Sequence, residues 1–110
     1  MREAIFTQGD FTLVKESGIG MSNTPWEGLH VISDGAANKH VVEVRLISDY
    51  QPFDGKPIKR RYESVYVAHG MRSQSDSFAD TEEYIRVLQD ALEFAKRVER
   101  YIHGNDWAKR

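Results

Sequence analysis

The sequence predicts an α+β domain, with an antiparallel sheet of about four to five strands and one long C-terminal helix packed on one face of it. Up to about residue 70, short runs rich in β-branched and aromatic residues alternate with turns that contain glycine, proline or asparagine. From residue 80, apolar residues recur three and four positions apart, the period of a helix. The 110 residues fit a single domain with one core.

The sheet is predicted to begin with a hairpin over residues 4–7 and 11–15. These runs flank Gln8-Gly9-Asp10, where Gly9 or Asp10 is expected to adopt a left-handed backbone conformation. Residues 17–24 then read as a loop.

A meander of three strands is expected next, because β-rich runs continue beyond this loop. Residues 34–38, with the sequence Asp-Gly-Ala-Ala-Asn, are interpreted as the connection between the first two of these strands. The three predicted strands comprise residues 26–33, 40–50 and 58–69.

A turn at Asp54-Gly55 would join the last two strands. Counting back from it sets Val44 opposite Val65 and Val42 opposite Val67, so that apolar side chains meet on one face. Glu43 would lie opposite Tyr66, and Ile47 opposite Tyr62. Since side chains alternate between faces, the same register predicts an open opposite face. That face would carry Glu43, Arg45, Arg60, Tyr62, Ser64 and Tyr66.

The C-terminal helix is predicted over residues 80–103, after a loop at 71–79 and before a short tail at 104–110. Asp80 with Glu83 forms a capping box, and Gly104 is a natural stop. The main apolar stripe comprises Tyr84, Leu88, Ala91, Ala95, Val98 and Ile102.

A second apolar line runs beside the main stripe, at Val87, Phe94 and Tyr101, seven residues apart. The apolar arc is therefore wider than contact with one sheet requires. Two interpretations stay open: a partner helix covers these residues, such as the same helix of a second copy, or they lean over the sheet margin and meet the N-terminal hairpin or the Trp26 loop.

Composition excludes several classes of function. The chain has no cysteine, which rules out disulfides, thiolate catalysis and cysteine-bound zinc, and which suits a cytoplasmic protein. The net charge of −2 gives no overall attraction to polyanions, and no apolar run approaches the roughly 20 residues that span a membrane. We therefore expect no membrane contact.

A basic run with tyrosines nearby raises a nucleic-acid hypothesis, because guanidinium groups and aromatic rings on an open sheet can hold phosphates and stack bases. The alternative, which we favour, is that the cations keep a hairpin tip in solution and protect a sheet edge. The residues of the nucleic-acid hypothesis are Arg45, Lys56, Lys59, Arg60, Arg61, Tyr62 and Tyr66.

No pattern predicts a catalytic centre, a metal site or a cofactor. The four histidines have no helical pairing with another ligand, and Gly18-Ile19-Gly20 lacks the rest of a phosphate loop. Of the two tryptophans, Trp26 is expected in the core and Trp107 partly exposed.

By elimination, the sequence predicts a non-catalytic module that binds another protein, including a second copy of itself through the helix. We expect an adaptor, regulator or inhibitor, of the kind that phages and mobile elements often encode as accessory proteins. A nucleic-acid-binding protein is the alternative, and an enzyme or small-ligand domain ranks third. The expected partner-binding residues are Arg45, Arg60, Tyr62, Tyr66, Val87, Phe94 and Tyr101.

Overall fold

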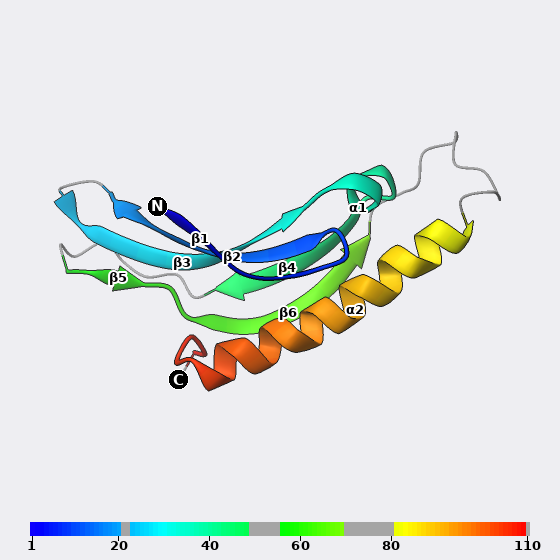
Figure 1. The fold of residues 1–110 in the computed structure, drawn as a ribbon. Helices are drawn as coiled ribbons and strands as arrows, with labels where there is room; N and C mark the ends of the chain where they lie inside the picture. The colour runs from blue at the N-terminus through cyan, green and yellow to red at the C-terminus, as the bar shows by residue number, and fades with distance from the viewer. Residues whose placement is uncertain (21–22, 49–55, 70–80, 110) are drawn as a thin grey trace.

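A computed structural model describes residues 1–20, 23–48, 56–69 and 81–109, and confirms the α+β class (Figure 1). One sheet has the strand order β1-β2-β3-β5 and the other pairs β4 with β6, while a long helix, α2, packs against them. The elements are β1 (Arg2–Gln8), β2 (Phe11–Ile19), β3 (Pro25–Ser33), α1 (Gly35–Lys39), β4 (Val42–Ser48), β5 (Ile58–Lys59), β6 (Tyr62–His69) and α2 (Thr81–Gly104).

The N-terminal hairpin of β1 and β2 is confirmed, with Gly9 in the left-handed region at φ 57°. Residues 17–19, expected in a loop, instead extend β2 and pair with residues 25–27 of β3. Strand pairing satisfies the backbone of Gly18 despite the weak strand propensity of glycine. The expected turn at residues 34–38 contains α1, whose N-cap Asp34 accepts a 2.7 Å hydrogen bond from the Gly35 amide.

The pairing of β4 with β6 is antiparallel as predicted, but its register differs by two residues. Val44 lies opposite Val67 and Arg45 opposite Tyr66. A shift of two residues keeps every side chain on its face, so the sorting into core and open faces survives for most positions. The Asp54-Gly55 turn lies outside the described residues, as does Asp80, the N-cap residue of the predicted capping box.

The predicted strand over residues 58–69 is wrong as a single element. Its first part, β5, pairs in parallel with Trp26 and Glu27 of β3, and its second part, β6, belongs to the other sheet. The chain changes sheet at Tyr62. Here the Tyr62 amide donates to the Trp107 carbonyl and its carbonyl accepts from the Lys109 amide, both at 2.9 Å. The expected three-strand meander is therefore split between two sheets.

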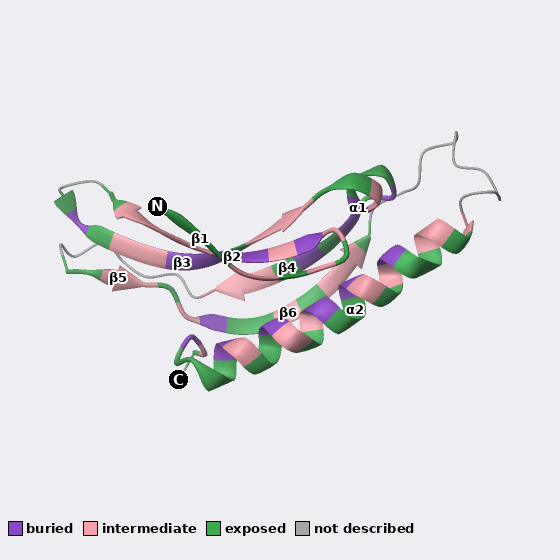
Figure 2. Ribbon diagram, in the orientation of Figure 1, coloured by how far each residue is buried: buried purple, intermediate pink, exposed green. Residues whose placement is uncertain are grey.

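Helix α2 closely matches its predicted range and runs along the two sheets, and its buried residues lie on the face toward them (Figure 2). The second line of apolar residues is part of this core, which corrects the expectation that Val87 and Phe94 bind a partner. Phe94 is fully buried, stacked on Phe11 with a centroid distance of 5.6 Å and edge-on to Phe6 at 5.5 Å. Tyr101 is half-buried against the same Phe6. Packing over the N-terminal hairpin explains the wide apolar arc.

The two tryptophans exchange their expected environments. Trp107 is buried, with Lys59 Nζ 4.4 Å from the centre of its ring and the Tyr62 ring centroid 6.2 Å away. Trp26 is only half-buried and lies over Gly18 of β2. The C-terminal tail therefore contributes Trp107 to the core, and backbone pairing of Ala108 with Tyr62 holds the tail in place. None of the helices in the described part of the chain could cross a membrane.

Candidate functional site: a groove between two open strand edges

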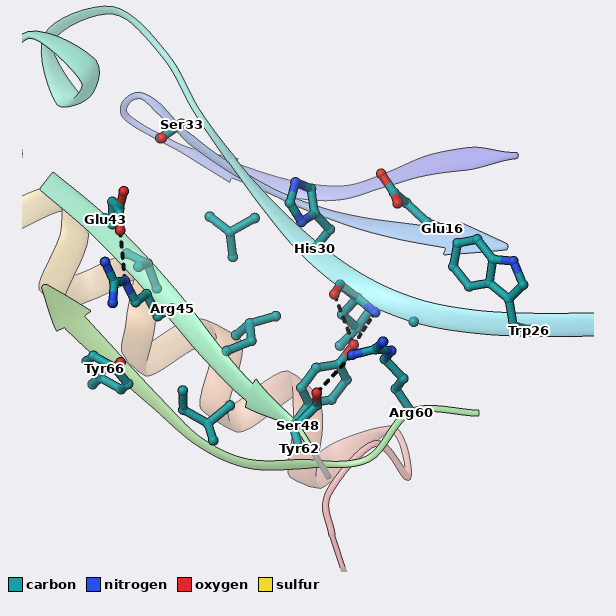
Figure 3. A pocket seen from close by; sticks show the side chains of 16 residues that line it. Glu16, Trp26, His30, Ser33, Glu43, Arg45, Ser48, Arg60, Tyr62 and Tyr66 are labelled. Carbon is teal, nitrogen blue, oxygen red and sulfur yellow. Dashed lines mark hydrogen bonds and ion pairs between the residues drawn. The ribbon is translucent and has the colours of Figure 1, made fainter. Parts of the chain in front are cut away.

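A groove of about 670 Å³ lies between β3 and β4, where the two sheets diverge (Figure 3). We call it the interstrand groove. Leu29 and Val31 of β3 and Val44 and Leu46 of β4 are among its apolar lining residues. Its polar lining is Glu16, His30, Ser33, Glu43, Arg45, Ser48, Arg60, Tyr62 and Tyr66.

Each of the two strands offers an open backbone edge to the groove. Among the residues that the structure describes, β4 pairs only with β6, and β3 pairs with β5 only through Trp26 and Glu27. Backbone groups of a strand alternate in direction, and those of Leu29 point away from β2 toward Tyr62. The β2–β3 register is regular, so the amide and carbonyl of Val31 and Ser33 also point away from β2.

Tyr62 occupies the backbone groups of Leu29, the first of these outward-facing positions on β3. Its hydroxyl accepts a 2.5 Å hydrogen bond from the Leu29 amide and donates a 2.9 Å hydrogen bond to the Leu29 carbonyl. Tyr62 is only 4% exposed, which corrects its expected place on an open face. Burial, as the main cause, raises the pKa of its phenol. The protonated hydroxyl thus replaces a neighbouring strand at Leu29.

Gly28 allows this arrangement. A Cβ at this position would lie 3.2 Å from the Tyr62 hydroxyl oxygen and 3.5 Å from Cδ of Arg60. Both side chains therefore cross the strand where a side chain is missing. A glycine within a β-rich run is a sequence signal for such a close approach. The sequence shows Gly28 but not what approaches it.

Arg60 lies beside Tyr62 at the end of the groove where β4 finishes. Its Nη1 donates a 3.1 Å hydrogen bond to the Ser48 hydroxyl. Arg60 is exposed and forms no ion pair with any residue in the described ranges. Ser48, which the sequence did not single out, thus holds the guanidinium toward the groove (Figure 3).

Arg45 and Glu43 form an internal ion pair on β4, nearer the start of that strand. Arg45 Nε donates to Glu43 at 2.8 Å, and this hydrogen bond raises the pKa of the arginine, with a smaller effect from Tyr66. Tyr66 lies opposite Arg45 on β6 and is 42% exposed. The structure therefore brings together four expected residues around the groove: Arg45, Arg60, Tyr62 and Tyr66.

The remaining cations of the nucleic-acid hypothesis have separate roles. Lys59 lies over Trp107 with a second contact to Glu27 at 3.9 Å. Arg61 donates to the Asp106 carbonyl and lies 3.5 Å from its carboxylate. Lys56 is exposed just before β5. Lys59 and Arg61 thus contact the C-terminal tail at Trp107 and Asp106, and neither lines the interstrand groove.

The histidines do not form a metal site, and no group of three or more metal-ligating side chains occurs among the residues that the structure describes. His30 is exposed at the groove. His40 is fully buried, with its Nε2 3.0 Å from a Glu83 carboxylate oxygen, and so links α1 to α2.

No protein-family model, curated protein sequence or solved structure matches this chain significantly. What the groove can bind therefore follows from its own geometry. It combines open backbone edges, a position on β3 closed by Tyr62, and an arginine that lacks a carboxylate partner among the described residues.

Proposed function

We propose that the protein is a non-catalytic binding module that takes up an extended segment of a partner protein in the interstrand groove. The segment would add as a strand to the open edge of β3, on the side that faces β4 across the groove. The observation that supports this most strongly is that two strands of different sheets present to one groove edges that no strand in the described ranges pairs with. Main-chain hydrogen bonds would supply affinity, and contacts to alternate side chains would supply specificity.

The chemistry of the β3 edge supports strand addition. At Leu29 a single hydroxyl takes both backbone hydrogen bonds that a neighbouring strand would make. The next outward-facing positions on the same edge are Val31 and Ser33, which line the groove. An extended peptide matches this donor and acceptor pattern, and each hydrogen bond contributes roughly 0.5–1.5 kcal/mol.

Two observations favour a peptide over nucleic acid. Tyr62, one of the two candidate stacking tyrosines, is buried with its hydroxyl bonded to Leu29. Lys59 and Arg61 fasten the C-terminal tail outside the groove. A stacking platform needs exposed rings beside a continuous positive track, whereas the groove is lined by both acidic and basic side chains.

The test uses a synthetic library of randomised octapeptides, selected on the immobilised protein and measured by fluorescence anisotropy. Val31→Pro removes the groove-facing amide, which takes no part in pairing with β2. Val31→Ala is the matched control, since it also loses side-chain packing but keeps the amide.

Selected peptides are expected to bind the wild-type protein and Val31→Ala, and to lose affinity by at least about tenfold on Val31→Pro. Amide NMR shifts should concentrate at β3 and β4. Equal affinity for the two Val31 variants would overturn strand addition to β3. Shifts confined to exposed α2 residues such as Ile85 and Leu92 would move the site to the helix.

A further inference from the structure

Resting on this proposed function, we infer that the interstrand groove recognises the C-terminal end of its partner, with the terminal carboxylate held by Arg60. The inference joins two features at the same end of the groove: a closed strand edge and a cation without a carboxylate partner among the described residues. Each feature limits what a bound segment can be at that position.

The first feature limits how far a bound strand can extend along β3. Going from Ser33 toward the beginning of β3, the open edge ends at Leu29, where the Tyr62 hydroxyl occupies both backbone groups. Beyond that point β5 occupies the same edge at Glu27 and Trp26. A strand that pairs with Val31 and Ser33 must therefore end or leave the sheet beside Tyr62.

The second feature is the charge at this end. The acidic residues that line the groove are Glu16 and Glu43, and both already have arginine partners. Glu16 pairs with Arg2 at 2.6 Å, and Glu43 pairs with Arg45 at 2.8 Å. Within the described ranges, the side-chain hydrogen-bond partner of Arg60 is the neutral Ser48 hydroxyl at 3.1 Å, and no carboxylate pairs with it. The groove is thus left with a positive charge beside the point where the bound strand stops.

A C-terminal carboxylate fits this end and an N-terminal amine does not. A planar guanidinium can bind a carboxylate with two parallel hydrogen bonds, whereas an amine would meet like charge. Ser48 leaves other guanidinium N–H groups of Arg60 available, because its bond uses Nη1. The fixed carboxyl end also sets direction: the segment would run antiparallel to β3 and parallel to β4.

Side-chain specificity follows from the alternation along the bound strand. Val31 of β3 and Val44 and Leu46 of β4 give the groove its apolar surface. Every second residue of the tail would face this surface, and the others would face solvent. We therefore expect tails with apolar residues at alternate positions next to the terminal carboxylate.

The experiment compares each selected octapeptide as a free acid and as a C-terminal amide, by anisotropy against the wild-type protein, Arg60→Gln and Arg60→Lys. Arg86→Gln is the matched control, because Arg86 is exposed on α2 away from the groove. The wild-type protein and Arg86→Gln should bind the acid at least about tenfold more tightly than the amide. Arg60→Gln should remove that difference. Arg60→Lys should retain part of it, because lysine keeps the positive charge but lacks the planar guanidinium that binds a carboxylate with two hydrogen bonds.

The outcomes separate this inference from the proposed function. If acid and amide bind equally but Val31→Pro still weakens both, strand addition holds and recognition of the terminus is wrong. An acid preference that persists in Arg60→Gln also overturns the role of Arg60. If affinity depends on an internal Asp or Glu, the carboxylate comes from a side chain and not from a terminus. If no peptide binding responds to Val31→Pro, the proposed function itself fails.

Discussion

The hydroxyl of Tyr62 hydrogen-bonds both the amide and the carbonyl of Leu29, at 2.5 and 2.9 Å. One side chain from β6 thus completes the backbone pairing of β3 at the point where the two sheets come together. The same residue pairs with the C-terminal tail through its own backbone. Tyr62 therefore connects three parts of the fold and limits the length of the open groove edge.

Tyr62→Phe is expected to destabilise the protein by about 1–3 kcal/mol, because the mutation leaves two buried backbone groups without a partner. Urea unfolding followed by circular dichroism measures this change. Tyr66→Phe is the matched control, since Tyr66 is 42% exposed, and it should change stability by less than about 0.5 kcal/mol. Equal effects of the two substitutions would show that the Leu29 bonds contribute little.

Alkaline pH should destabilise the protein in part through Tyr62. Burial raises the pKa of this phenol in the folded state above the usual value of about 10. The neutral form is therefore favoured on folding. Its stabilising contribution is complete below pH 10 and is lost as pH rises through the folded-state pKa.

Comparing the wild-type protein with Tyr62→Phe isolates this contribution from other titrating groups. The stability difference between them should shrink from about pH 8 to about pH 11. A difference that stays constant over this range would mean that the folded and unfolded states share one tyrosine pKa.

Gly28→Ala should destabilise the protein by about 1 kcal/mol, because a methyl group would approach the Tyr62 hydroxyl to 3.2 Å. In a double-mutant cycle, Tyr62→Phe should relieve most of this effect by removing the hydroxyl oxygen. Stability of the four proteins is measured by urea unfolding. Additive effects would mean that the added methyl group destabilises the protein through another contact, such as Arg60 Cδ, which would lie 3.5 Å from it.

Phe94→Ala is expected to cost about 3–5 kcal/mol, because Phe94 is fully buried between Phe11 and Phe6. Leu92→Ala is the control on the outer face of the same helix, where Leu92 is 54% exposed, and it should cost less than about 0.5 kcal/mol. Thermal and urea unfolding measure both variants. A Phe94 variant that stays equally stable but loses self-association would restore the interpretation of this residue as a partner contact.

Elements with strong local signals could be predicted from the order of residues alone. The helix of residues 81–104 follows from apolar periodicity, and the first hairpin follows from Gly9 between two β-rich runs. The sorting of β4 and β6 side chains into two faces also survived a register error of two residues, because strand periodicity is two. Such features depend on residues close together in the chain.

The division into two sheets and the groove between them depend on contacts between residues far apart in the chain, which local patterns do not show. The break after β5 depends on Tyr62 bonding to Leu29, which is 33 residues away, and to the tail around Trp107. The burial of Phe94 likewise depends on aromatic residues of the N-terminal hairpin. The spacing of apolar residues indicates which face of a helix or strand they share, but not which distant residues that face contacts. The groove and its open edges arise from those distant contacts.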